Sequence, residues 1–170
     1  MLLFDLDGTL TDPRAGMVRC MRHALDTLGS PCPSDDVLAS FIGPPIRGTF
    51  GTLLATSDRE LIERATSLYR EQYGVSGLFE NRVYDGVAEM LDRVGPMAAA
   101  TFVATLKPKP YADRIVQRLG LDRYFAGVYG TALEERFGEK VALLAHLLET
   151  ERLSAANAAM IGDRVRREKR

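Results

Sequence analysis

Apolar and polar residues along the chain follow two alternating patterns, one typical of strands and one typical of helices. Apolar runs typical of buried strands occupy the residues before Asp5, residues 98–104, the segment near Val128 and residues 158–161. Helical spacing of apolar residues recurs between these runs, at residues 85–94 with Asp85 as the expected cap, at 111–119 and at 139–150. Strands that alternate with helices predict an α/β fold, in which helices cover both faces of a parallel sheet.

One segment departs from this alternation because it shows helical periodicity alone. We expect helices there at residues 14–28, at 34–41 with Ser34 as cap, after Pro44-Pro45, and to about Tyr73 after a capping box at residues 57–60. The chain is therefore predicted to have two parts. Residues 1–14 and 83–170 form an α/β core, and residues 15–82 form a helical module inserted after the first strand.

Two acidic residues follow the first apolar run. Asp5 and Asp7 lie two positions apart, so on a strand they share one face. Carboxylates so close repel each other unless a cation or a proton lies between them. Gly8 permits a sharp exit from the strand, and Thr9 offers a hydroxyl beside it. A plain Asp-Gly turn is the structural alternative, but it needs only one acid. The pair therefore favours a binding or catalytic site.

Polar residues also follow two of the other apolar runs, at Thr105 and Asp163. The carboxyl ends of parallel strands meet at one edge of a sheet, and ligands bind there. We therefore expect these two residues to lie beside Asp5 and Asp7, although they are distant in the sequence.

The string from Phe4 to Asp12, FDLDGTLTD, resembles the first motif of the haloacid dehalogenase superfamily, in its phosphoglycolate-phosphatase-like branch. Three further stretches resemble its second, third and fourth motifs: Val103 to Pro108, Gly138-Glu139-Lys140, and Met160 to Arg164. Four motifs in this order are far more specific than any one alone. The resemblance implies a Rossmann-like, doubly wound core with a small helical cap inserted after the first strand.

The resemblance also implies how the site would work. A phosphate monoester carries about two negative charges, so a carboxylate attacks it only when cations neutralise the phosphoryl group. Asp5 would be the nucleophile that forms an aspartyl-phosphate, and Asp7 the general acid and base. Thr105 and Lys140 would bind the phosphoryl oxygens. Further phosphate or substrate contacts are assigned to Gly8, Thr9 and Arg47.

Magnesium is the implied cofactor, held by Asp5, Asp7 and Asp163. The family uses the backbone carbonyl at the Asp7 position, and magnesium prefers such oxygen ligands. The fourth motif departs from the family pattern, because Arg167 stands where a second acid is usual and Glu168 follows one position late. We therefore expect weakened magnesium binding.

The end of the sequence also departs from the family, whose chains normally continue with a further helix and strand. Residues 164–170 instead carry five cations and one acid, so the sequence is interpreted as truncated or as a fragment. An open sheet edge at residues 158–161 would follow, through which the chain could self-associate.

Three of these assignments, and one further residue of the second motif, have structural alternatives. Thr105 could cap the following helix, Lys107 could be an ordinary surface lysine, and Lys140 could be solvated like most lysines. Arg47 follows a loop that resembles the substrate-facing loop of the family's cap, and could equally be a solvated helix residue.

Composition narrows the class of protein. With 22 basic and 23 acidic residues, the net charge of −1 gives no support for nucleic acid or an acidic membrane surface as a partner. No apolar run reaches membrane-spanning length, and the first strand leaves no room for a signal peptide. Cys20 and Cys32 lack metal-type spacing, which favours a reducing, cytoplasmic setting.

Taken with these exclusions, the resemblance implies magnesium-dependent hydrolysis of a small phosphorylated metabolite, such as phosphoglycolate or a nucleoside monophosphate. Two alternatives remain: a phosphomutase on the same scaffold, and a non-catalytic domain that retains only binding.

Overall fold

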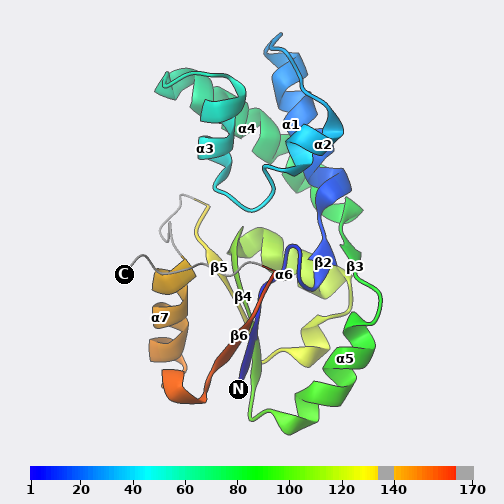
Figure 1. Ribbon diagram of the computed structural model, residues 1–170, viewed down its shortest axis with the longest axis vertical. Coiled ribbons are helices and arrows are strands. Elements are labelled where there is room, and N and C mark those ends of the chain that lie inside the picture. Colours follow the sequence, from blue (N-terminus) through cyan, green and yellow to red (C-terminus); the bar gives the residue numbers. More distant parts are fainter. Residues whose placement is uncertain (134–139, 164–170) are drawn as a thin grey trace. The chain divides into compact units, whose positions relative to one another are not determined.

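The computed structural model describes residues 1–133 and 140–163. The chain divides into two compact units, which we call the sheet unit (Met1–Asp12 and Arg82–Arg170) and the helical unit (Pro13–Asn81). Figure 1 labels their elements. Where the chain leaves and re-enters the sheet unit, β2 (Thr11–Asp12) pairs antiparallel with β3 (Arg82–Val83). That the two units serve as catalytic core and cap stays a prediction.

The sheet unit contains a four-stranded sheet in the order β5-β4-β1-β6, in which all neighbours are parallel. Its strands are β1 (Leu2–Phe4), β4 (Thr101–Pro108), β5 (Gly127–Thr131) and β6 (Ala159–Ile161). At the end of β1, Phe4 lies opposite Val103 on one side and Ile161 on the other. The predicted α/β class and parallel sheet are confirmed.

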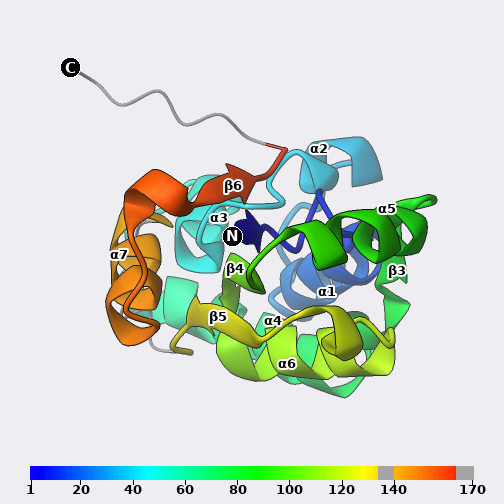
Figure 2. The same cartoon turned by 90° about the horizontal axis from the view of Figure 1, so that it is seen from below.

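Helices cover both faces of this sheet. Figure 2 shows α7 (Lys140–Thr150) on one face, and α5 (Val87–Val94) and α6 (Lys109–Arg118) on the other. On the first face, the α7 residue Leu147 packs against Leu3 and Phe102 and is fully buried. Each large apolar side chain buried in this way stabilises the fold by about 1.5–3 kcal/mol. The core therefore holds β1 and β4 in fixed positions.

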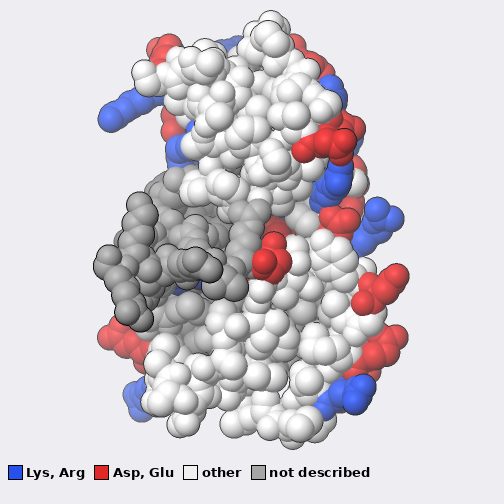
Figure 3. Space-filling view, in the orientation of Figure 1, with Lys and Arg blue, Asp and Glu red and all other residues white. Residues whose placement is uncertain are grey.

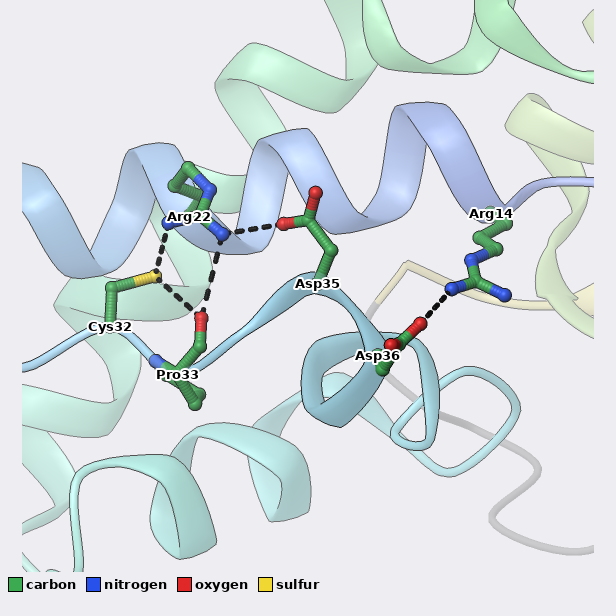
Figure 4. A network of polar contacts seen from close by, with 6 residues as sticks. All are labelled: Arg14, Arg22, Cys32, Pro33, Asp35 and Asp36. Atoms are coloured by element: carbon green, nitrogen blue, oxygen red, sulfur yellow. Dashed lines mark hydrogen bonds and ion pairs between the residues drawn. The ribbon is translucent and has the colours of Figure 1, made fainter.

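The helical unit consists of α1 (Arg14–Thr27), α2 (Asp35–Ala39), α3 (Ile46–Leu53), α4 (Arg59–Val75) and the 3-10 turn η1 (Gly77–Glu80). Its helix α1 approaches η1 so closely that a Cβ at Gly16 would lie 2.0 Å from the carbonyl oxygen of Gly77. Two ion pairs, Arg14–Asp36 and Arg22–Asp35, tie α1 to α2 (Figure 4).

Several expected boundaries were wrong. Helix α5 begins after Gly86, which occupies the cap position with φ +81°, so Asp85 is not its cap. Helix α4 is capped by Asp58, which accepts hydrogen bonds from the amides of Glu60 and Leu61, rather than by a box that starts at residue 57. Strand β4 spans Thr101–Pro108 instead of residues 98–104.

The remaining surface features bear on partners. Strand β6 is the edge strand of the sheet, with Ala159 and Met160 exposed. Association of two chains through this edge stays a prediction.

On the face drawn in Figure 3, the coloured basic and acidic side chains are dispersed and form no large patch of one sign. Within residues 1–133 and 140–163, none of the helices has the length and apolar character that crossing a membrane requires.

Candidate functional site

The site begins where β1 ends. Asp5 continues the pairing with β6, because its amide donates to the Ile161 carbonyl oxygen at 2.9 Å. The Leu6 amide donates to Asp5 Oδ1 at 2.9 Å, which orients the carboxylate. The chain then turns sharply at Gly8, whose φ is +82° and whose amide donates to the Thr11 carbonyl oxygen at 2.8 Å. Backbone hydrogen bonds therefore position the first acid and the loop that follows it.

A second acid, Asp163, lies against this loop from the end of β6. Its amide donates to Thr9 Oγ1 at 3.1 Å, and its carboxylate oxygen Oδ2 would lie only 2.7 Å from a Cβ at Gly8. A Cβ at Gly162 would lie 3.9 Å from Asp5 Oδ2. The carboxylates of Asp5 and Asp163 thus lie at the same corner of the sheet, and the absence of a side chain at Gly8 makes room for one of them.

The third part of the site comes from β4 beyond the end of β1. The pairing of β4 with β5 is irregular between Ala104 and Pro108. Thr105 and Lys107, two positions apart in this stretch, are buried, and the Lys107 amide donates to Thr105 Oγ1 at 3.2 Å. A hydroxyl and an ammonium are therefore carried by the segment that extends past the paired part of the sheet.

Two lysines each contact one acid of the first motif. Lys140, the first residue of α7, places its Nζ 2.7 Å from Asp5 Oδ2 and donates to the Ala104 carbonyl oxygen at 2.6 Å. Lys107 places its Nζ 2.6 Å from Asp7 Oδ2. Burial lowers the pKa of the Lys140 ammonium below its ordinary value, and the nearby carboxylates, Asp5 foremost, offset this only in part.

The structure brings most of the predicted site residues to one corner of the sheet unit: Asp5, Asp7, Gly8, Thr9, Thr105, Lys140 and Asp163. Their catalytic roles stay predictions. Thr105 lies inside β4 and does not cap α6, whose N-terminal cap position is Pro108. Lys140 is not solvated, since its side chain is 15% exposed.

Lys107 was given no site role from the sequence, and the alternative considered for it is wrong. It is not a surface lysine, because its side chain is 4% exposed and paired with Asp7. The available signal was its position two residues after Thr105 on the same apolar strand, which places both on one face.

Two other groups of residues stand apart from this corner. Arg47 belongs to the helical unit, where its guanidinium on α3 makes two contacts with the Glu63 carboxylate of α4. Its role in substrate binding stays a prediction. Gly138, Arg167 and Glu168 lie outside the described residues.

The oxygen atoms at this corner suit magnesium. Within the described ranges, no group of three or more acidic, histidine or cysteine side chains is arranged to hold a metal ion. Magnesium, however, is usually bound by one or two carboxylates and keeps several waters. The carboxylates of Asp163, beside Gly8, and of Asp5, beside Gly162, provide such a set, and the backbone carbonyl of Asp7 could add a third oxygen.

Comparison with known proteins places the chain in a family. The model of the haloacid dehalogenase-like hydrolases matches residues 2–167. The chain belongs to this family. The resemblance seen in its four motifs is thereby confirmed, and the chain is a member of a hydrolase family whose relatives include phosphatases.

Several relatives of this hydrolase-family chain carry names that indicate an activity. A 5'-nucleotidase from Pseudomonas aeruginosa is 42% identical over 96% of the chain and 74% of its own length. Tyrosine-protein kinase PtkA from Mycobacterium tuberculosis is 36% identical over 96% of the chain, which spans just over half of that protein, 55%. A phosphoglycolate phosphatase from Vibrio parahaemolyticus is 27% identical over 96% of the chain and 75% of its length.

A solved structure supports the same fold. The crystal structure of a predicted phosphatase from Clostridium acetobutylicum superimposes with a TM-score of 0.89 at 31% identity, over 96% of the chain and 75% of that protein.

Proposed function

We propose that this chain is a magnesium-dependent phosphatase that hydrolyses a small phosphate monoester through an aspartyl-phosphate on Asp5. The observation that supports this best is the contact of 2.7 Å between Asp5 Oδ2 and Lys140 Nζ. A cation held against the attacking carboxylate would also meet the phosphoryl oxygens once the substrate binds, and would reduce the repulsion between two anions.

The proposed reaction has two steps. An Asp5 oxygen attacks phosphorus, the bond between phosphorus and the ester oxygen breaks, and Asp7 gives its proton to the departing alcohol. In the second step Asp7 takes a proton from water, whose oxygen attacks phosphorus. Inorganic phosphate leaves, and the Asp5 carboxylate is restored. The Thr105 hydroxyl and the Lys140 ammonium would bind the phosphoryl oxygens throughout.

Asp5, Asp163 and the backbone carbonyl of Asp7 would hold the magnesium ion. When bound, the ion would supply positive charge that stabilises the transferring phosphoryl group. The position of Arg167 in the fourth motif, where the family has an acid, leads us to propose an unusually high magnesium requirement.

The substrate class is proposed from the relatives. The 5'-nucleotidase is the relative with the higher identity, so a nucleoside 5'-monophosphate is the first candidate, and phosphoglycolate is the second. Both are small phosphate monoesters of an alcohol.

The test is phosphate release from a nucleoside 5'-monophosphate, from 2-phosphoglycolate and from 4-nitrophenyl phosphate, with excess magnesium or with EDTA. We expect magnesium-dependent release by the wild-type chain. In Asp5→Asn, which is nearly isosteric, we expect loss of turnover and retention of the fold by circular dichroism. Near-wild-type turnover by a folded Asp5→Asn variant would rule out the nucleophile.

Phosphate release, together with phosphorus NMR of the products, also distinguishes a phosphatase from a phosphomutase and from a non-catalytic binding domain. A phosphomutase would convert the ester into an isomeric ester without releasing phosphate, which phosphorus NMR would show. A binding domain would release no phosphate at any magnesium concentration.

A further inference from the structure

Lys107 and Asp7 form an ion pair that is almost excluded from solvent. The Lys107 Nζ lies 2.6 Å from Asp7 Oδ2, and the two side chains are 4% and 16% exposed. The second carboxylate oxygen, Asp7 Oδ1, is buried and has no hydrogen-bond partner among the described residues. The two oxygens of Asp7 are therefore not equivalent.

The backbone around Lys107 is held independently of Asp7. The Lys107 amide donates to Thr105 Oγ1 at 3.2 Å, and the Thr131 hydroxyl donates to the Leu106 carbonyl oxygen at 3.0 Å. On β5, a Cβ at Gly130 would lie 2.6 Å from the Lys107 carbonyl oxygen, so the two backbones are in close contact. A lysine anchored on both sides in this way can act as a fixed point for a neighbouring carboxylate.

From this geometry we propose that Lys107 is a positioning residue for Asp7. It holds Oδ2 by the ammonium contact and fixes the rotamer of the carboxylate. Oδ1, which has no hydrogen-bond partner among the described residues, is left as the oxygen that takes a proton from water in the second step and gives it to the departing alcohol in the first. This inference rests on the proposed phosphatase function. It gives the two lysines different tasks: Lys140 acts at the attacking carboxylate, whereas Lys107 acts through Asp7.

The two tasks can be told apart by the leaving group. The 4-nitrophenolate ion departs without a proton, whereas the alkoxide of a nucleoside 5'-monophosphate needs one. Loss of Lys107 should therefore slow the alkyl ester far more than the aryl ester. A well-placed general acid contributes about 10²–10⁴-fold to the rate, so misplacing Asp7 should lower the alkyl-to-aryl ratio of kcat/KM by about 10–100-fold. This ratio reports the first step alone, because hydrolysis of the aspartyl-phosphate is common to both esters and enters only kcat.

The experiment compares Lys107→Met, Lys107→Arg and Lys109→Met with the wild-type chain. Lys109, two positions further on, is exposed and paired only locally, with Asp113 at 2.9 Å, so it controls for removing a lysine from this segment. The ratio of kcat/KM for the two esters does not depend on the folded fraction. We expect the ratio to fall in Lys107→Met, to recover in part in Lys107→Arg, and to stay unchanged in Lys109→Met.

An equal fall in kcat/KM for both esters in Lys107→Met would overturn the inference while leaving the proposed function intact. A wild-type chain that releases phosphate from neither ester would overturn the proposed function and this role with it. If Lys107→Met does not fold, Lys107→Gln takes its place, because it keeps a hydrogen-bond donor and loses the charge. The same ratio then decides.

Discussion

The packing of Asp163 against Gly8 predicts that one methyl group can disturb the proposed metal site. A Cβ at Gly8 would lie 2.7 Å from Asp163 Oδ2 and 3.0 Å from its Cγ. Carbon atoms do not approach so closely, so in Gly8→Ala either the carboxylate or the backbone must move. The proposed ligand would then leave its place beside Asp5, although no charged group has been changed.

The chain offers a matched control for the backbone strain of this substitution. Gly8 has φ +82° and Gly86 has φ +81°, but a Cβ at Gly86 would meet no atom within 4 Å. Both alanine variants carry the strain of the left-handed conformation, about 1–2 kcal/mol. A loss of 1 kcal/mol corresponds to a fall in Tm of about 2–4 °C in a chain of this size. Any effect of Gly8→Ala beyond that of Gly86→Ala therefore comes from the contact with Asp163.

The assays are thermal unfolding and a magnesium titration of phosphate release. We expect similar falls in Tm from strain alone, and a further loss of stability in Gly8→Ala if the backbone has to move. The magnesium concentration for half-maximal activity should rise about 10–100-fold in Gly8→Ala, the range seen when a metal ligand loses its orienting partner, and should stay unchanged in Gly86→Ala. Identical magnesium dependence in the two variants would refute the assignment of Asp163.

Three further predictions concern the helical unit. Gly16→Ala should destabilise the chain by about 1–3 kcal/mol, because the new methyl group meets the Gly77 carbonyl oxygen. Gly48→Ala in α3, where a Cβ meets nothing within 4 Å, should stabilise the chain by up to about 1 kcal/mol. Urea unfolding measures both changes in the free energy of unfolding, and changes in the same direction would contradict the packing at Gly16. Burial raises the pKa of the Cys20 thiol from 9.0 to about 11, so between these pH values the folded chain binds more protons than the unfolded chain. The free energy of unfolding should therefore fall as pH rises from 9 to 11, and this fall should be smaller in Cys20→Ala. At pH 8, iodoacetamide should label the partly exposed Cys32 first and Cys20 only as fast as the chain opens; prompt labelling of Cys20 would be inconsistent with its burial.

The parts of the structure that follow from strand geometry could be predicted from the sequence. Asp5 and Asp7 are two positions apart after an apolar run, and Asp163 follows another such run. In a parallel sheet this arrangement alone brings the acids to one edge. The helical insertion was likewise visible in its periodicity. These features depend on local pattern and topology, which a single sequence carries.

Features that depend on tertiary contacts were missed. Lys107 is buried because β4 extends past β1 and lies against the backbone of Gly130, and neither contact has a periodic signature. The caps failed for a related reason. Ser57 and Asp58 are both good capping residues, and only the backbone conformation at Asp58 decides between them. At α5, a turn with positive φ gave the cap position to Gly86.

The charges of the described site give an independent reason to expect a metal requirement. Asp5, Asp7 and Asp163 carry three negative charges when ionised, and the ammonium groups of Lys107 and Lys140 compensate two of them. A phosphate monoester would bring about two more negative charges into a place where burial strengthens their repulsion. A divalent cation at the Asp5 and Asp163 carboxylates would remove most of this excess. Metal and substrate should therefore each strengthen the binding of the other. Lys107, through its ion pair with Asp7, contributes to this balance of charge without having to touch the phosphate.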